Sequence, residues 1–384
     1  MKKILICINN MKMGGIQKSL LELLKQIENI YDVTLFSISP DGELLKYVPK
    51  GIKIKYANRI MLASELTVEE AKKEGIPCFI TKVIGNAWSR VFTKKIPAYI
   101  VTKFFQNRLG IYDVAISFSQ PVEEHQFYML SNEVVLNSCK AHKKITFLHC
   151  DFKNYGGNSK LNREMYKKFD RIAAVSDSVG NRFLSILPEL NEKIRTVYNC
   201  HDYKEIERLA SISPIIYKNK AIITVSRLSA EKGIIRVLPL LKRLIKKGYD
   251  ISWHIVGDGS LYNEIKKIIK ELNLEDRVFL YGIKENPYRY MKNATVFLLP
   301  SFHEAAPMVF DEAKTLHIPI ITTNTLSAHE LVSKHKDGFV CENTDEAIYK
   351  ALKAFFDGDI DFNLSNFQAK DNKVQLAQFS DLVD

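Results

Sequence analysis

The sequence predicts an α/β protein made of two Rossmann-like domains. Short apolar runs of strand character alternate with helical patterns along the chain, which indicates parallel sheets. The series of strands restarts after a polar connection at residues 201–213, and 384 residues is too long for one ordinary core. We therefore expect an N-terminal domain over residues 1–205 and a C-terminal domain over residues 206–384.

The N-terminal domain opens with a strand at residues 3–8, a turn at Gly14 and Gly15, and a helix. The apolar residues of this helix recur at helical spacing, from Ile16 to Ile27. We expect Cys7, inside the first strand, to be a buried thiol. Further strands are expected at residues 33–38, 52–56, 113–118, 145–149, 171–175 and 195–198.

The C-terminal domain repeats this alternation. Its strands are expected at residues 221–225, 251–256, 277–281, 294–299, 318–322 and 338–341. The tail from residue 357 onward is polar and ends in a weak helical pattern, which could pack back on the N-terminal domain.

Composition narrows the class of protein. No stretch approaches the roughly 20 continuous apolar residues that cross a bilayer, and the start runs directly into a strand pattern, so we expect a cytoplasmic protein. The six cysteines are scattered, without a CxxC pair and without metal-ligand spacing to histidine. We therefore expect reduced thiols and no metal site.

The net positive charge of the chain comes entirely from its first half. Residues 1–200 hold 30 Lys and Arg against 19 Asp and Glu, whereas residues 201–384 hold 25 of each. This half could meet a membrane surface, a phosphate-linked acceptor or nucleic acid, or the lysines could simply keep the protein in solution.

Residues 88–105 combine aromatic and aliphatic side chains with Arg90, Lys94, Lys95 and Lys103. Such a basic amphipathic element is typical of segments that lie on anionic lipid. An aromatic stripe at helical spacing is also common in a core, and Pro97 interrupts the helix. We favour a peripheral contact with the inner face of the cell membrane.

The segment SFHEAAPMVFDEA, residues 301–313, carries the clearest chemistry. Pro307 suits a first helical position, so Glu304 should lie on the incoming loop and Glu312 in the second helical turn. The strand before it places this loop at the carboxyl end of a parallel sheet, where doubly wound folds bind ligands. Helix-start N–H groups favour a phosphate and carboxylates accept hydrogen bonds from hydroxyls, which together indicate a nucleotide sugar.

Two further loops of the C-terminal half point to the same edge. Arg227 and Lys232 lie five residues apart after a strand, where they could converge on a diphosphate, although this spacing alone is common on surfaces. The turn VGDG, with Gly257, follows another strand and opens into a helix; an ordinary strand-to-helix turn explains it equally well.

In the N-terminal half, Gly14 and Gly15 should either approach another group closely or adopt positive φ. His149 lies at the carboxyl end of a strand beside Asp151. A lone histidine there is more often structural, but this one would face the space between the domains if the two sheets oppose each other.

Taken in order, these segments resemble the retaining glycosyltransferases of family 4, which have the GT-B fold: two Rossmann-like domains facing each other across a cleft. The resemblance spans residues 14–338 and rests on motif order. The motifs are the GG loop, His149, Val175 with Ser176, Asn199 with Asp202, RLxxxKG (227–233), VGDG (256–259), Tyr281 with Gly282, PSxxE (300–304), Glu304 with Glu312, and DGF (337–339).

The resemblance implies a role for each matching residue. Arg227 and Lys232 would neutralise the donor diphosphate, Glu312 would hold the ribose, and Glu304 would bind hydroxyls of the sugar. His149 would touch the donor sugar from the N-terminal domain, and Glu304, His149, Arg227 and Lys232 form the catalytic set. The implied donor-binding set adds Gly15, Gly257, Tyr281, Ala306, Met308 and Val309.

The resemblance also implies the type of reaction. Transfer would retain the anomeric configuration, need no metal or other cofactor, and use a UDP-sugar or, next, a GDP-sugar. A saccharide or lipid-linked saccharide acceptor would bind the N-terminal domain, near Gly14, His149 and Asp151, in cell-surface polysaccharide or glycolipid synthesis. Ala305 and Ala306 replace a glycine usual in the family, and Cys200 and His201 also depart from its pattern, which leaves the donor open.

Other functions remain to be weighed. A GT-B sugar-nucleotide epimerase would use similar residues, and a non-catalytic homologue could bind a sugar nucleotide or scaffold polysaccharide assembly. A dinucleotide oxidoreductase is disfavoured because the first strand leads to MKMGGIQ and not to GxGxxG. Nucleic-acid binding would leave the paired glutamates without a role, so we expect no such partner.

Overall fold

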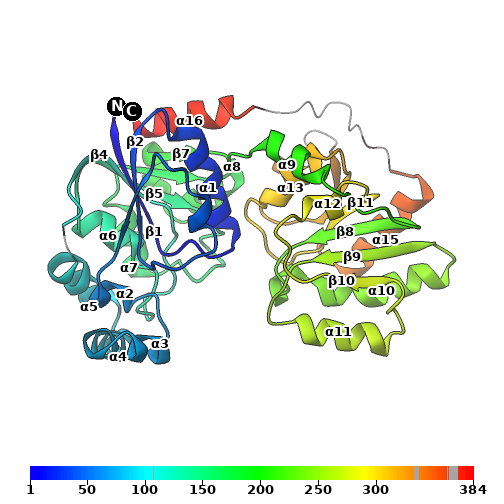
Figure 1. The fold of residues 1–384 in the computed structure, drawn as a ribbon, viewed down its shortest axis with the longest axis horizontal. Coiled ribbons are helices and arrows are strands. Elements are labelled where there is room, and N and C mark those ends of the chain that lie inside the picture. Colours follow the sequence, from blue (N-terminus) through cyan, green and yellow to red (C-terminus); the bar gives the residue numbers. More distant parts are fainter. Residues whose placement is uncertain (107, 333–336, 361, 363–370) are drawn as a thin grey trace. The chain divides into compact units, whose positions relative to one another are not determined.

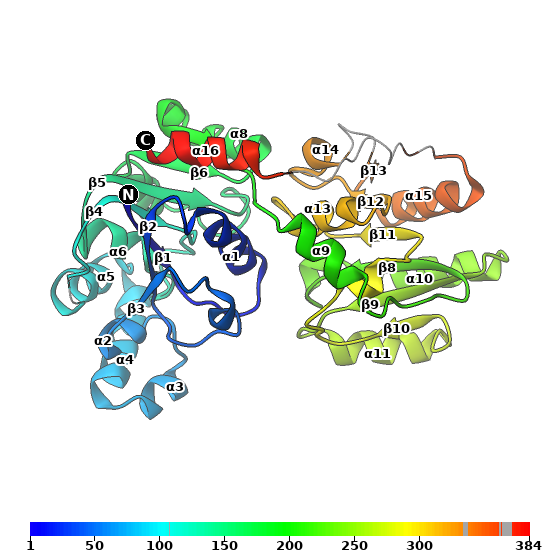
Figure 2. The same ribbon diagram turned by 45° about the horizontal axis from the view of Figure 1, so that its top comes forward.

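The computed structural model describes residues 1–384 except residues 107, 333–336, 361 and 363–370. The chain forms two compact units (Figures 1 and 2). Unit 1 contains Met1–Cys200 together with Asn372–Asp384, and unit 2 contains His201–Asp371.

Unit 1 is built on a seven-stranded sheet with the order β3-β2-β1-β4-β5-β6-β7, and all of its strand pairs are parallel. The central strands β1 and β4 are almost wholly buried and β5 is buried over its last four residues, as expected for a parallel sheet covered on both faces. The strands are β1 Lys3–Ile8, β2 Asp32–Ser37, β3 Lys53–Tyr56, β4 Ile111–Ser117, β5 Lys140–Leu148, β6 Arg171–Ala174 and β7 Ile194–Thr196.

Some helices of unit 1 begin at side-chain caps. Thr67 and Glu70 form a capping box at α3, and the Ser176 hydroxyl accepts the Val179 N–H at α8. The α-helices are α1 Gly15–Ile27, α2 Arg59–Leu62, α3 Val68–Lys73, α4 Ile76–Val91, α5 Lys95–Ile100, α6 Ser131–Asn137, α7 Lys160–Tyr166 and α8 Asp177–Leu184, and a π-helical turn covers Val101–Phe105.

The last helix, α16 (Lys373–Val383), packs on unit 1, where Figure 1 shows it in red beside the first strands. The Tyr198 N–H donates to Gln378 Oε1 at 3.1 Å, and the Tyr31 and Phe379 rings meet edge to face at 6.0 Å. Lys2 and Asp384 form an ion pair at 2.6 Å, so the two termini lie together.

Unit 2 repeats the architecture with a six-stranded parallel sheet of order β10-β9-β8-β11-β12-β13. The strands are β8 Lys220–Val225, β9 Ile251–Val256, β10 Val278–Leu280, β11 Val296–Leu299, β12 Ile320–Thr323 and β13 Gly338–Cys341. The helices are α9 Tyr203–Ala210, α10 Ile234–Lys246, α11 Tyr262–Glu271, α12 Tyr288–Met291, α13 Met308–Thr315, α14 Ala328–Leu331 and α15 Asp345–Asp357.

One core cluster of unit 2 lies between its sheet and the helices α10, α11 and α15, and a second lies between the sheet and the helices α9, α12 and α13. Trp253 at the centre of β9 is fully buried, and its indole N–H donates to Thr224 Oγ1 at 3.0 Å, so its polar atom is satisfied inside the core. The expected α/β class with two Rossmann-like sheets is confirmed. Cys7 is buried as expected, and burial raises the pKa of its thiol well above the ordinary value. Among the described residues, no helix is long and apolar enough to cross a lipid bilayer.

Candidate functional site

The loop between β11 and α13 brings both predicted glutamates to the carboxyl edge of the unit 2 sheet. Glu304 lies on the loop, and Glu312 lies in the second turn of α13 with only 1% of its surface exposed. Pro307 occupies the N-cap position, with φ −66° and ψ 120°, and so precedes the first helical residue that we expected it to be. The extended backbone before Met308 lets the loop turn into the helix.

Lys232 and Glu304 form the central ion pair of this edge. The Lys232 ammonium lies 2.6 Å from Glu304 Oε1, and the Ser301 hydroxyl donates to the same oxygen at 2.7 Å. Both side chains are mostly buried, at 15% and 10% exposure. Because attraction between charges is stronger away from water, this pair holds the Glu304 carboxylate in a defined position.

Arg227 pairs with a different carboxylate. Its guanidinium lies 3.4 Å from Glu231 Oε1, and its side chain is 70% exposed. The same Glu231 oxygen accepts the Ser229 hydroxyl at 2.6 Å. The edge therefore holds one buried cation, Lys232, and one exposed cation, Arg227, each paired with its own glutamate.

Two glycines allow the loops of this edge to approach one another. At Gly257, with φ +141°, an added Cβ would lie 1.8 Å from the Ser226 carbonyl oxygen. At Gly233, with φ +65°, it would lie 2.1 Å from the Pro300 carbonyl oxygen. Side chains are excluded at both positions by conformation and by space, so the predicted glycine at 257 shapes the site by close backbone packing.

Arg236, which we had not predicted as a site residue, holds the backbone of the Glu304 loop through hydrogen bonds. Its guanidinium donates to the Pro300 carbonyl at 3.1 and 2.6 Å and to Asn343 Oδ1 at 2.8 Å, and it lies 3.9 Å from the centroid of the Phe302 ring. In sequence it resembles any solvated arginine in a helix. Only its position relative to the β11 loop, 64 residues later, reveals its role.

Tyr281 belongs to an aromatic cluster behind the edge. Its hydroxyl lies 2.9 Å from His254 Nδ1, and the two rings stack. Burial lowers the pKa of His254 to about 4 and raises that of Tyr281, so both are neutral near pH 7. Of the other predicted donor contacts at the start of α13, Met308 is buried, while Ala306 and Val309 are partly exposed.

His201, one of the departures from the family pattern, also reaches α13. Its Nε2 lies 3.3 Å from Asp311 Oδ2, and the ring is only 2% exposed. Cys200, the other departure, is buried in unit 1, and burial raises the pKa of its thiol to about 12.

At the carboxyl edge of the unit 1 sheet, His149 lies among aromatic rings. Its ring centroid is 4.7 Å from that of Phe118 and 5.6 Å from that of Phe147. Burial lowers the pKa of His149 to about 3, although the Phe118 carbonyl accepts a hydrogen bond from the ring. Nε2 is buried without a hydrogen-bond partner in the described part of the chain. The predicted histidine is therefore neutral and has one ring nitrogen available.

The Gly14–Gly15 turn meets one of the two expected requirements. Gly14 is extended, with φ −174°, and Gly15 is not among the glycines with positive φ. A Cβ at Gly14 would lie 2.5 Å from Gln17 Oε1, so the backbone approaches another group closely there, whereas a Cβ at Gly15 would meet no atom within 4 Å.

Asp151 organises its own loop. Its carboxylate accepts the Lys153 N–H at 2.9 Å and the Asn154 side-chain amide at 2.9 Å. These contacts give Asp151 a structural role in its loop, and this role does not require a substrate.

Glu65 is a further buried carboxyl group at the unit 1 edge that the sequence did not reveal. The side-chain amide of Asn9, directly after β1, donates to Glu65 Oε1 at 3.0 Å, and Glu65 Oε2 is buried without a partner among the described residues. Burial raises the pKa of Glu65 to about 7. Glu65 comes just before the capping box of α3, and no local sequence pattern there distinguishes it from other glutamates.

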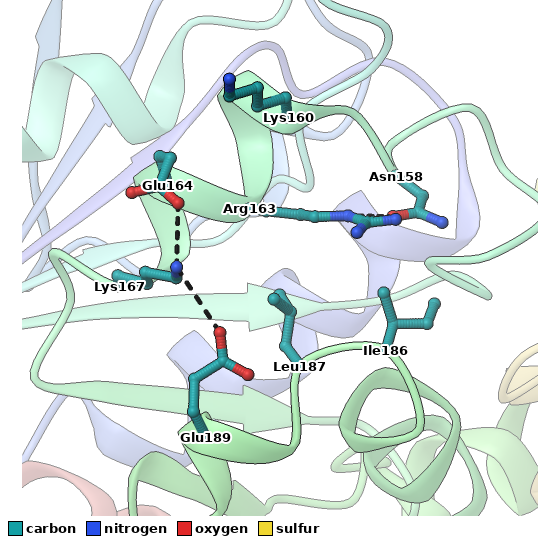
Figure 3. Close-up of a pocket in the computed structure, with 8 residues that line it drawn as sticks. All are labelled: Asn158, Lys160, Arg163, Glu164, Lys167, Ile186, Leu187 and Glu189. Carbon is teal, nitrogen blue, oxygen red and sulfur yellow. Dashed lines mark hydrogen bonds and ion pairs between the residues drawn. The ribbon is translucent and has the colours of Figure 1, made fainter.

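A separate surface pocket of unit 1 contains none of the predicted residues (Figure 3). Lys167 pairs there with Glu164 at 2.8 Å and with Glu189 at 3.5 Å, and Arg163 Nε donates to Asn158 Oδ1 at 2.8 Å. The figure shows Lys160 pointing away from these pairs. The charges of Lys167, Glu164 and Glu189 thus compensate one another within the pocket.

Comparison with known proteins shows which proteins parts of this chain resemble. The model of the group 1 glycosyl transferases matches residues 205–369. A glycosyltransferase of Methanocaldococcus jannaschii, described as uncharacterized, is 28% identical over 41% of this chain and 41% of its own. A Campylobacter jejuni enzyme named as an N-acetylgalactosamine-N,N′-diacetylbacillosaminyl-diphospho-undecaprenol 4-alpha-N-acetylgalactosaminyltransferase is 30% identical over 59% of this chain and 61% of its own.

The fold is shared more widely than the sequence. The crystal structure of Anabaena HepE in complex with UDP and glucose superposes with a TM-score of 0.62 at 16% identity, covering 99% of this chain and 100% of that one. The chain spans about 41% and 61% of the lengths of the two curated relatives above. These matches show that residues 205–369 are similar to the group 1 glycosyl transferases and that the chain has the GT-B fold.

Proposed function

We propose that this protein is a retaining glycosyltransferase that moves a sugar from a nucleotide-sugar donor to a saccharide or lipid-linked saccharide acceptor. The observation that carries the proposal is the mostly buried Lys232–Glu304 pair, 2.6 Å apart, at the carboxyl edge of the unit 2 sheet. An ammonium and a carboxylate fixed together there suit a ligand that carries both a diphosphate and sugar hydroxyls.

The donor diphosphate is assigned to the two cations. Lys232 provides a charge already held in place, and the exposed Arg227 side chain can turn from Glu231 to a phosphate at little cost, because a surface ion pair contributes little. Positive charge fixed before the reaction stabilises the nucleoside diphosphate as it leaves.

The hydroxyl groups of the donor are assigned to the two glutamates. Glu304, fixed by Lys232 and Ser301, accepts from hydroxyls of the sugar, and Glu312 accepts from the ribose. Gly257, Tyr281, Ala306, Met308 and Val309 complete the proposed donor site, together with Gly15 of unit 1. Arg236 acts as a positioning residue, because it holds the backbone of the Glu304 loop.

His149 is assigned a hydrogen bond to a substrate hydroxyl. With a pKa near 3 it is too weak a base to remove a proton at neutral pH, but its neutral Nε2 can accept a hydrogen bond.

The proposed reaction retains the anomeric configuration by attack on the face from which the diphosphate leaves. The bond between the anomeric carbon and the diphosphate oxygen breaks, and the acceptor oxygen bonds to that carbon. The acceptor proton passes to the departing phosphate oxygen, so no protein nucleophile is needed.

A UDP-sugar is the favoured donor, followed by a GDP-sugar. HepE is described with UDP and glucose, and the Campylobacter relative is named for an acceptor linked to diphospho-undecaprenol. By analogy we place this enzyme in cell-surface polysaccharide or glycolipid synthesis. Unit 1 would receive the acceptor, in a cytoplasmic protein in peripheral contact with the inner, anionic face of the membrane.

Thermal unfolding with UDP, GDP and ADP in turn, followed by transfer assays with the matching sugars, tests this proposal. A ligand at about 100 times its Kd adds about 2.7 kcal/mol to the free energy of unfolding, so one nucleotide should raise the Tm selectively. Anomerically retained product would support the proposal. Conversion of the donor without an acceptor would indicate an epimerase, and nucleotide binding without any turnover would indicate a non-catalytic homologue.

A further inference from the structure

In helix α4 of unit 1, the polar and apolar sides are exchanged relative to an ordinary surface helix. Its inner positions hold Cys78, Lys82, Gly85 and Ser89, all buried. Its outer positions are apolar: Ile76, Ile80, Val83, Ile84, Trp88 and Val91 are between 38% and 74% exposed. A surface helix normally turns its apolar stripe toward the core, so this stripe has no partner within the described part of the chain.

The packing of the inner side fixes this orientation. A Cβ at Gly85 would lie 2.6 Å from the Phe127 ring, so the helix meets unit 1 closely at this point. Lys82 Nζ lies 3.4 Å from the Phe127 carbonyl, and burial lowers the pKa of this lysine. Turning the helix over would bring larger side chains against Phe127 in place of Gly85 and would move Lys82 away from its contact.

The next elements extend the apolar face. Phe92 at the end of α4, and Ile96, Tyr99, Ile100, Phe104 and Phe105 on α5 and the π-helical turn, are between 39% and 70% exposed. With the six residues of α4 they form what we call the apolar face. Twelve of the 27 exposed large apolar residues identified in the described chain thus lie within 30 residues.

The charged side chains within residues 75–112, which include the apolar face, have one sign. Arg90, Lys95, Lys103 and Arg108 are exposed, and no Asp or Glu occurs between Glu74 and Asp113. A second copy of the chain docked face to face would bring these cations together, which disfavours pairing of two identical faces. A bilayer with anionic headgroups offers both an apolar layer and compensating charge.

We infer that the apolar face inserts into the headgroup boundary of an anionic lipid bilayer, with α4 lying in the membrane plane. This goes beyond the peripheral, charge-driven contact included in the proposed function, because burial of apolar side chains supplies much of the binding. It builds on that function by giving the glycosyltransferase access to an acceptor carried in the membrane.

The chain contains a natural probe for this insertion. Of its two tryptophans, Trp88 belongs to the apolar face and Trp253 is fully buried in unit 2. Vesicles of equimolar phosphatidylcholine and phosphatidylglycerol should bind the full chain in flotation and shift tryptophan emission to the blue. Trp88→Phe should keep the binding and lose the shift. High salt should weaken binding without abolishing it.

The decisive variant is the double change Ile80→Asn with Ile84→Asn, since both residues are exposed. We expect vesicle affinity to fall by about tenfold or more, because each change removes buried hydrocarbon. The matched control is Ile216→Asn with Ile283→Asn, which alters residues of unit 2 that are 78% and 64% exposed and should leave binding unchanged. Both double variants should keep the Tm shift with nucleotide.

Absence of vesicle binding by the wild-type chain, or equal binding by the Ile80/Ile84 variant, would overturn the inference. So would lipid-free self-association, measured by sedimentation, that only this variant abolishes, because the face would then be a protein interface. The binding assay contains neither donor nor acceptor. A failure of glycosyl transfer therefore leaves its result intact, and a failure of insertion leaves the proposed function standing.

Discussion

The carboxyl edges of the two sheets have the same topology but opposite electrostatic character. In unit 2 the edge carries ionised pairs, Lys232 with Glu304 and Arg227 with Glu231. In unit 1 burial favours neutral groups: His149 has a pKa of about 3 and Glu65 a pKa of about 7.

This difference separates two tasks that the same fold can perform. Ionised pairs at an edge can exchange partners with a charged ligand, which suits a diphosphate. Neutral buried groups can exchange hydrogen bonds with hydroxyls, without a change in charge. The contrast can be tested by altering one edge at a time.

The largest effect is expected from Lys232→Ala. The change removes the fixed cation and leaves the Glu304 carboxylate without its counterion, so kcat/KM should fall by about 100- to 1,000-fold, the scale of losing one preorganised electrostatic contact. Steady-state kinetics with the selected donor measures this. Lys246→Ala, an exposed lysine of α10, is the control. Unchanged turnover in the Lys232 variant would remove this residue from the site.

Gly257→Ala should be the most damaging glycine change at the ionic edge. It combines positive φ with a clash against the Ser226 carbonyl, and we expect about 2–4 kcal/mol of lost stability in denaturant unfolding. Gly248→Ala is the matched control, because Gly248 has φ +94° but open space around its Cβ position. Equal losses in the two variants would show that conformation alone matters and that close approach does not.

Arg236→Ala tests whether the Glu304 loop needs its support. We expect kcat/KM to fall by about tenfold, mainly through kcat, with about 1–3 kcal/mol of lost stability from the unpaired Pro300 carbonyl. Arg243→Ala is the control on the same helix, since Arg243 also lies over an aromatic ring, Tyr349, and pairs with Glu346. If the two variants lose equal activity, Arg236 has no special link to the site.

The smallest effect on activity is expected at the neutral edge, where stability is the readout. The folded pKa of Glu65 lies above the unfolded value of 4.5, so its contribution to stability is fully present below pH 4.5 and is lost as pH rises through about 7. At about 1.4 kcal/mol for each unit of pKa shift, Glu65→Gln should therefore gain up to about 3 kcal/mol relative to wild type as pH rises from 4.5 to about 7. Denaturant unfolding at pH 5 and pH 8 measures the gain, and a difference between variant and wild type that does not change with pH would refute it.

The sequence predicted the sheets closely because parallel strands buried on both faces are short apolar runs. Residues 251–256 and 338–341 match β9 and β13 without a shift. The Glu304 loop was predictable for a related reason: Pro307 and the preceding strand mark it locally. Local sequence patterns therefore predicted where the strands lie along the chain and one loop of the candidate site.

The remaining features depend on contacts between distant segments. Arg236 supports a loop 64 residues away, and Glu65 meets Asn9 across 56 residues. The segment at residues 88–105 was expected on the surface, but the earlier part of α4 was not, because the spacing of residues cannot distinguish an outward-facing apolar stripe from a core-facing one. Of the two alternatives that the sequence left open for Gly14 and Gly15, the structure has close approach, at Gly14, and no positive φ.

The most direct test of the ionic edge compares a nucleoside diphosphate with its nucleoside, for example UDP with uridine, in calorimetric titrations of the wild-type protein and of Lys232→Ala. The account predicts that the diphosphate binds far more tightly than the nucleoside to the wild-type protein, and that most of this advantage disappears in the variant. Equal affinities for the two ligands, or an advantage that survives the loss of Lys232, would contradict the assignment of the diphosphate to this edge.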